Sequence, residues 1–189
     1  RLRQQLSASP TLVKRLWQAI IKCKIQRQAD VLQQFCGDDA VLLGMGRRVK
    51  SGDKGNLEAQ AAQRYWPRLM GKNFKRERYG APPNQLLNYG YAVTRAAVAR
   101  SLCISGLHPG IGLFHSNRSN SFPLADDILE VFRPMIDLRV RHIITADKSG
   151  DLTADHKARI LSLLNEPVAM PMGELPLHIA IQNTCASLA

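Results

Sequence analysis

The chain has 189 residues, enough for one sizeable core, and its hydrophobic content of 45% excludes an intrinsically disordered protein. Its 26 Lys and Arg against 15 Asp and Glu give a net charge of +11. This charge indicates a polyanionic partner, nucleic acid first and acidic lipid second, although a basic surface that only keeps the protein soluble explains it equally well. The sequence has no apolar run of membrane-spanning length, no recognisable signal peptide and no CxxC pair, so we expect a cytoplasmic protein with reduced cysteines.

The first long helix is predicted from Ser9-Pro10-Thr11, which combines a capping residue with a first-turn proline, to about Phe35. Several cations decorate it and either form a solvated face or touch phosphate: Lys14, Arg15, Lys22, Lys24 and Arg27. Gly44 to Gly55 then reads as a flexible basic loop, a surface loop or a phosphate contact, without the GK[ST] ending of a Walker loop.

A second helix is predicted from Asn56 to Gly71, with Glu58 in its first turn, where the helix dipole favours an acid. A basic connector with several prolines follows. The most apolar helix is expected from about Asn84 to Leu107, and its small residues allow close packing at the centre of the fold. Three polar residues interrupt this helix and form either a satisfied core network or a wall of a site: Asn88, Tyr91 and Arg95.

The remaining chain also reads as helix, which predicts an all-α, multi-helical fold in a single domain of residues 1–189. Helices are expected from about Pro123 to His142, from Thr153 to Leu164, and from about Leu175 to the end. Between the first two, Ile143 to Leu152 is expected to form a loop or a short hairpin.

The chemistry-bearing residues gather between Gly106 and Asp137. Asp127 and Glu130 are spaced i, i+3 and so share one helix face, and the loop from Ser116 to Pro123 is long enough to bring His115 towards them. Carboxylates and a neutral imidazole are ligands for Mg²⁺, Mn²⁺ or Zn²⁺, although His115 alone could equally be a capping or core histidine. Asp126 points away and fits better as an acid near the helix N-terminus.

Other catalytic templates are missing from the sequence, including the ExxH, GxSxG and HExxH motifs and the common RNA-binding and zinc-finger signatures. Acids and a histidine within a basic protein suit phosphodiester chemistry, in which cations hold the nucleic-acid backbone and a divalent ion polarises one phosphate. Spacing alone does not tell whether Glu58, on another helix, joins this cluster.

Three segments resemble one known family in the right order and at fitting separations: NLEAQAAQRYW, NQLLNYGYAVTRAAVAR and GLHPGIGLFHSNRSNSFPLADDILEVFRPMID. The family is the CRISPR-associated spacer-acquisition integrase, in the form found in loci with a single-protein effector nuclease. The likeness covers Leu12 to Val140. Family members have an N-terminal β domain before a helical catalytic domain, so this sequence would begin at the interdomain linker, residues 1–10, without the β domain.

The resemblance implies that Glu58, His115 and Glu130 bind Mg²⁺ or Mn²⁺, with Asp127 as an additional catalytic acid. It implies an endonuclease and integrase that joins the 3′-hydroxyl of a captured DNA fragment to a CRISPR repeat by transesterification. The implied partners are double-stranded DNA and the small second protein of CRISPR adaptation. The β domain contributes to the family's homodimer, so neither a dimer nor full integration is assumed for this chain alone.

Eleven residues are predicted DNA contacts, mostly cations of the two basic segments, with two polar residues suggested by the resemblance: Arg47, Arg48, Lys50, Lys54, Arg64, Lys72, Lys75, Arg76, Arg78, Asn88 and Tyr91. Two other hypotheses stay open. The chain could be a helical DNA-binding or assembly module whose acids are structural, or a general metal-dependent nuclease unconnected with CRISPR.

Overall fold

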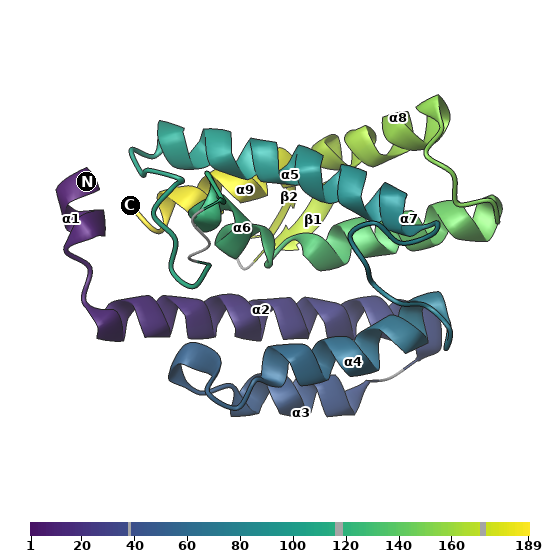
Figure 1. The fold of residues 1–189 in the computed structure, drawn as a ribbon, viewed down its shortest axis with the longest axis horizontal. Helices are drawn as coiled ribbons and strands as arrows, with labels where there is room; N and C mark the ends of the chain where they lie inside the picture. Colours follow the sequence, from purple (N-terminus) through teal and green to yellow (C-terminus); the bar gives the residue numbers. More distant parts are fainter. Residues whose placement is uncertain (38, 116–118, 171–172) are drawn as a thin grey trace.

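The structure is a computed structural model that describes residues 1–37, 39–115, 119–170 and 173–189. Its elements confirm the predominantly helical fold class (Figure 1), and the sheet among these residues has two strands. The helices are α1 (Leu2–Leu6), α2 (Pro10–Cys36), α3 (Ala40–Arg48), α4 (Leu57–Met70), α5 (Asn84–Ile104), α6 (Pro123–Leu129), α7 (Arg133–Ala146), α8 (Ala154–Ser162) and α9 (Leu177–Ala186), with 3₁₀ turns η1 (Ser51–Asp53) and η2 (Leu163–Asn165) and strands β1 (Pro167–Met170) and β2 (Gly173–Pro176).

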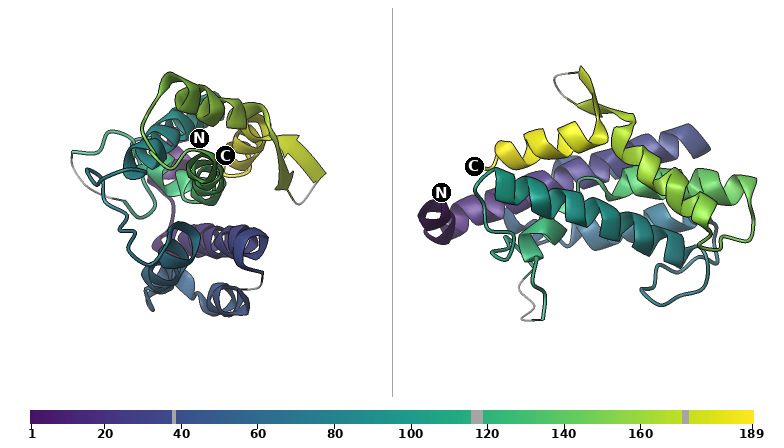
Figure 2. Two further views of the ribbon diagram at one scale, coloured as in Figure 1. Left: turned by 90° about the vertical axis from the view of Figure 1, so that its right-hand side faces the viewer. Right: turned by 90° about the horizontal axis from the view of Figure 1, so that it is seen from above.

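The helices form two groups, with α2, α3 and α4 on one side and α5 to α9 on the other (Figure 2, left). Helix α2 lies where the groups meet and contacts both α4 and α7. Its start is the predicted one, because the Ser9 hydroxyl accepts a hydrogen bond from the Leu12 amide and Pro10 occupies the first turn. The buried side of α2 carries Trp17, Ile21 and Ile25. Burying each such side chain contributes about 2 kcal/mol.

The predicted loop from Gly44 to Gly55 is partly wrong, because α3 covers its first five residues. The Asp39 carboxylate caps α3 by accepting a hydrogen bond from the Leu42 amide at 3.2 Å. Leu42 and Met45, spaced i, i+3, are buried, and that packing outweighs the low helix propensity of the two glycines.

Helix α4 is one residue shorter at each end than the predicted helix from Asn56 to Gly71. Asp53 accepts hydrogen bonds from the amides of Leu57 and Glu58, both at 3.0 Å, and so fixes the first turn. Helix α5 is the closely packed helix that was expected. A side chain at Gly90 would meet Ile136 of α7 at 2.4 Å, so only glycine allows this approach.

The single helix predicted from Pro123 to His142 is instead two helices, α6 and α7, with a break between Leu129 and Arg133. Pro134, in the first turn of α7, has no N–H to bond the carbonyl of Glu130, which weakens a continuous helix at this point and suits the start of a new one. The break leaves Glu130 at a corner, as the residue that ends α6.

Two further expectations differ from the structure. Helix α7 extends to Ala146, so the loop predicted from Ile143 starts later and no hairpin forms there. An antiparallel hairpin that was not predicted lies between η2 and α9, with Val168 paired to Leu175. None of the described helices is long and apolar enough to cross a membrane.

Candidate metal centre

Two of the three predicted metal ligands meet at one side chain. The ammonium of Lys24, on α2, lies 2.6 Å from a carboxylate oxygen of Glu58 on α4 and 2.5 Å from one of Glu130 at the end of α6. The Lys24 and Glu130 side chains are only 10% and 4% exposed, whereas that of Glu58 is 27% exposed. Three helices that are distant in the sequence thus bring two carboxylates to one cation.

The charges of this group stabilise its ionised forms despite burial. Burial alone would raise the pKa of Glu130, but the positive charges of Lys24 and Arg133 outweigh it and lower that pKa below its ordinary value. Burial alone would lower the pKa of Lys24, but Glu130 and Glu58 outweigh it and raise that pKa. The guanidinium of Arg133 lies 2.9 Å from the other oxygen of Glu130.

The expectation that Lys24 forms part of a solvated or phosphate-contacting face is wrong, since its side chain is buried. The sequence carried a signal for this, because Lys24 lies at helical spacing from Ile20, Ile21 and Gln28, which are also buried. A cation within an apolar stripe indicates a buried counter-charge.

His115 forms the other part of the candidate site. Its Nδ1 lies 2.6 Å from a carboxylate oxygen of Asp127, which also accepts hydrogen bonds from the amides of Leu113, Phe114 and His115. The bond to Asp127 raises the pKa of His115 above its ordinary value, against the effect of partial burial. In a neutral ring whose Nδ1 donates to Asp127, Nε2 is the atom left with a lone pair for a ligand.

Asp127 is fully buried, and its two oxygens are occupied by the backbone of residues 113–115 and by His115. It therefore orients the histidine. The neighbouring Asp126 pairs with Arg95 at 2.6 Å and accepts a hydrogen bond from Asn120, away from the cluster, as its position on the helix predicted.

Aromatic packing that the sequence did not predict holds His115 from a second side. Trp17 of α2 is buried and stacks on Phe114, with 4.4 Å between the ring centres. The rings of Trp17 and His115 meet edge to face at 5.9 Å. A tryptophan on the long helix thus restrains the loop that carries the histidine.

A buried carboxylate lies beneath the centre. Asp137 of α7 is fully buried and accepts hydrogen bonds from the hydroxyls of Tyr65 and Tyr91. Burial raises its pKa to about 7, although these hydrogen bonds and Arg133 act in the opposite direction. Arg133 also lies over the Tyr91 ring at 4.7 Å, which links this network to Glu130.

No three His, Cys, Asp or Glu side chains in residues 1–37, 39–115, 119–170 and 173–189 are already grouped as a metal shell. The ammonium of Lys24 nevertheless contacts Glu58 and Glu130 as a bound cation would, and His115 and Glu130 are close enough to affect each other's pKa. Two carboxylates and an imidazole nitrogen are a donor set that suits Mn²⁺ and accepts Mg²⁺. The residue types present therefore suit a divalent ion, and in this structure Lys24 lies between the two glutamates.

The predicted DNA contacts fall into two sets. Most lie exposed at the surface, either around the end of α3 and η1 or in the connector between α4 and α5: Arg47, Arg48, Lys50, Lys54, Lys72, Lys75 and Arg78. The others are engaged within the protein. Arg64 pairs with Asp39 at 3.1 Å, and Arg76 donates to Asn84 and Asn88.

Tyr91 is 6% exposed, and its hydroxyl donates a hydrogen bond to Asp137. It therefore belongs to the buried network next to the site and is not an exposed DNA contact. Asn88 accepts from Arg76 and donates to the carbonyl of Arg78, which ties the basic connector to α5. Residues 116–118, part of the loop expected to bring His115 towards the acids, lie outside the described residues.

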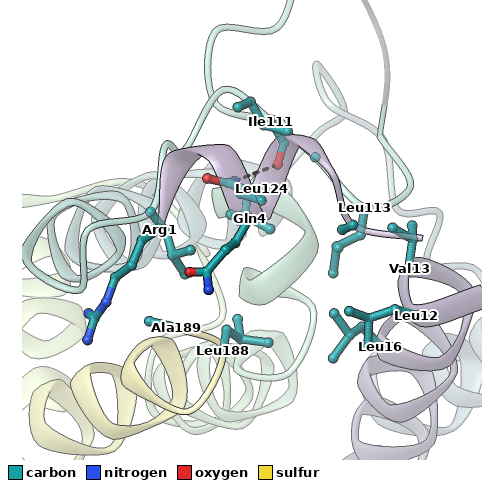
Figure 3. Close-up of a pocket in the computed structure, with 14 residues that line it drawn as sticks. Arg1, Gln4, Leu12, Val13, Leu16, Ile111, Leu113, Leu124, Leu188 and Ala189 are labelled. Carbon is teal, nitrogen blue, oxygen red and sulfur yellow. Dashed lines mark hydrogen bonds between the residues drawn. The ribbon is translucent and has the colours of Figure 1, made fainter. Parts of the chain in front are cut away.

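A cavity of about 220 Å³ lies behind the histidine loop, near both ends of the chain (Figure 3). Its walls are mainly aliphatic and include Leu12, Leu16, Ile111, Leu113, Leu124 and Leu188. The carboxylates of Glu58, Asp127 and Glu130 are not among its lining residues, so this cavity is separate from the candidate metal centre.

Comparison with known proteins gives consistent results. Residues 1–165 match the family model described as CRISPR associated protein Cas1. The CRISPR-associated endonuclease Cas1 of Neisseria meningitidis serogroup C is 40% identical over 189 residues, which cover 98% of this chain and 62% of that protein. A Cas1 endonuclease of Pyrobaculum aerophilum is 30% identical over 106 residues, covering 54% of this chain and 36% of that protein.

Two solved structures share the fold. A casposase bound to integration product superposes with a TM-score of 0.79 at 20% identity, covering 98% of this chain and 66% of that one. A Cas1 protein from Thermotoga maritima gives a TM-score of 0.73 at 17% identity, covering 99% of this chain and 66% of that one. This chain therefore spans roughly three fifths of the length of its Neisseria relative, and it belongs to the Cas1 family of CRISPR-associated proteins.

Proposed function

We propose that this chain is the catalytic part of a metal-dependent DNA endonuclease and integrase of CRISPR adaptation. The observation that carries the proposal is the convergence of Glu58 and Glu130 on one cation, together with a histidine whose Nδ1 is bound to Asp127, so that Nε2 can serve a metal. The names of the relatives support it, since the Neisseria protein is called an endonuclease and the casposase was solved with an integration product.

In this proposal Glu58, Glu130 and Nε2 of His115 hold Mg²⁺ or Mn²⁺, and Asp127 keeps the histidine in the required tautomer and orientation. The bound ion supplies Lewis-acid polarisation of a phosphate. The 3′-hydroxyl of a captured DNA fragment attacks that phosphorus in line. One P–O bond forms as the P–O bond of the repeat strand breaks, and the departing oxygen takes up the proton, so no covalent intermediate with the protein is required.

The exposed cations provide the DNA-binding part of the proposal. Lys50 and Lys54 flank η1, just before the helix that carries Glu58, so a phosphate backbone held there would run past the candidate centre. The net charge of +11 favours such a partner, and binding is expected to weaken steeply with salt. A second small adaptation protein and a homodimer are further expected partners, on family grounds alone.

Nicking and strand transfer on a CRISPR-repeat duplex, with Mg²⁺, with Mn²⁺ and with EDTA, test this function. Glu58→Gln is expected to fold normally and to lose at least about 100-fold of the metal-dependent activity. Glu174→Gln, at an exposed strand position, removes the same charge and should behave as the unaltered chain.

The other hypotheses predict different results. A Glu58→Gln variant with full activity would contradict the proposed metal centre. Degradation of DNA without joining and without dependence on the repeat would identify a general nuclease. DNA binding by both the unaltered chain and the Glu58→Gln variant, with no metal-dependent reaction by either one, would identify a binding module.

A further inference from the structure

The position of Lys24 raises a question that the proposed function leaves open. Its ammonium contacts the same two carboxylates, Glu58 and Glu130, that would bind the divalent ion. A divalent cation and an ammonium close to the same oxygens repel each other strongly, and more so where burial reduces solvent screening. Both therefore cannot occupy this position at once.

The contacts of Glu130 show that Lys24 does more than neutralise a single buried acid. Arg133 already pairs with one oxygen of Glu130 at 2.9 Å, and Lys24 takes the other. Its second contact, to Glu58 at 2.6 Å, joins α2 to the first turn of α4. Without a cation between them, two carboxylates from different helices would repel, and their helices would lose this link.

We propose that Lys24 is the resident cation of the metal-free centre. It holds Glu58 and Glu130 in position while no metal is bound, and it moves aside when a divalent ion enters. Lysine suits this role because its ammonium is a compact charge on a flexible four-carbon chain. The side of Glu58, which is 27% exposed, offers the route towards solvent. This inference rests on the proposed function.

The role of Lys24 has two measurable consequences of opposite sign. Removing its charge should destabilise the metal-free protein, because the carboxylates lose the cation between them. The same change should strengthen metal binding, because a divalent ion then has no ammonium to displace. A lysine that only contributed to packing would produce the first effect without the second.

Lys24→Met keeps an unbranched side chain that is one atom shorter and removes its charge, and Lys22→Met, at an exposed position on the same helix, is the matched control. Thermal unfolding in EDTA and calorimetric titration with MnCl₂ are the measurements. In EDTA, Lys24→Met is expected to lower Tm by about 5 °C or more. It should bind Mn²⁺ at least about tenfold more tightly than the unaltered chain. Lys22→Met should change neither value.

Further variants separate the possible outcomes. Lys24→Gln replaces Lys24→Met if the latter fails to fold, and Lys24→Arg, which keeps the charge, should bind Mn²⁺ no more tightly than the unaltered chain. Adding Glu58→Gln to Lys24→Met should abolish the gain, which places the ion at this centre. Unchanged or weaker Mn²⁺ binding by Lys24→Met, with binding by the unaltered chain still dependent on Glu58, would overturn the role of Lys24 and leave the proposed function intact. No Mn²⁺ binding by any of these proteins would overturn both.

Discussion

The two halves of the candidate centre are built in different ways. The Glu58–Lys24–Glu130 half comes from three helices and is held by long-range packing around a buried ammonium. The His115–Asp127 half forms within one segment of the chain. The Asp127 carboxylate accepts hydrogen bonds from three backbone amides and orients the His115 ring, which is 39% exposed. The first half is therefore set by long-range packing. The second is set mainly by local hydrogen bonds, to which the Trp17 contacts are added, so each half should fail in its own way.

The largest expected effect is on the glutamate half. Glu130→Gln removes the negative charge between Lys24 and Arg133. Each of these two cations then loses its buried ion pair with residue 130. We expect loss of metal-dependent nicking together with about 3 kcal/mol of the free energy of unfolding, measured by urea denaturation in EDTA. Glu58→Gln, which is more exposed, should lose the same activity with less than half of that stability cost. If the two variants lost the same free energy of unfolding, the difference in burial between the two glutamates would not explain their contributions to stability.

The histidine half should respond to Asp127→Asn. An amide at this position cannot accept all the hydrogen bonds that the carboxylate accepts, so the loop of residues 113–115 should loosen, at a cost of about 2 kcal/mol. The pKa of His115, measured by NMR titration of its ring, should fall, because the charged acceptor that raises it is gone. Mn²⁺ affinity should fall about 10- to 100-fold. An unchanged His115 pKa would show that Asp127 does not control the ring.

The same half predicts how metal binding depends on pH. Since Asp127 raises the pKa of His115, the stabilisation from their ion pair is fully present below the ordinary value of 6.5 and is lost as pH rises through the raised pKa. Metal binding requires the neutral ring, so Mn²⁺ affinity should change in the opposite direction and fall up to about tenfold per pH unit below that pKa. His115→Gln should remove this dependence. A pH profile that is the same with and without the imidazole would exclude His115 as a ligand.

The smallest effects are expected outside both halves, at the exposed cations. Lys54→Ala and Arg47→Ala should change the free energy of unfolding by less than about 0.5 kcal/mol. Each should weaken DNA binding a few-fold and reduce the slope of log affinity against log salt by about 1, measured by fluorescence anisotropy. Glu174→Gln provides the neutral surface control. A variant with an unchanged salt slope would exclude that cation as a phosphate contact.

The sequence predicted what depends on neighbouring residues. Ser9 and Pro10 mark the start of α2, Glu58 falls in the first turn of α4, and the short spacing from His115 to Asp127 leads to a direct contact. These features follow from capping, from the helix dipole and from short loops, which act over a few residues.

What the sequence did not predict depends on contacts between distant segments. The burial of Lys24 requires Glu58 and Glu130 to lie beside α2, and the stacking of Trp17 on Phe114 requires the histidine loop to cross that helix. Packing against α2 also stabilises α3 despite its glycines. The helix break before Pro134 was within reach of sequence reasoning, because a proline four residues after Glu130 removes the donor for its carbonyl.

The most direct test of the account is an anomalous-scattering map from a crystal of this chain soaked in Mn²⁺. We predict one strong peak within ligand distance of Glu58, Glu130 and Nε2 of His115, with the ammonium of Lys24 no longer between the two carboxylates. A map in which Lys24 still bridges Glu58 and Glu130, while Mn²⁺ binds only elsewhere, would contradict the claim that both halves of the centre share one ion.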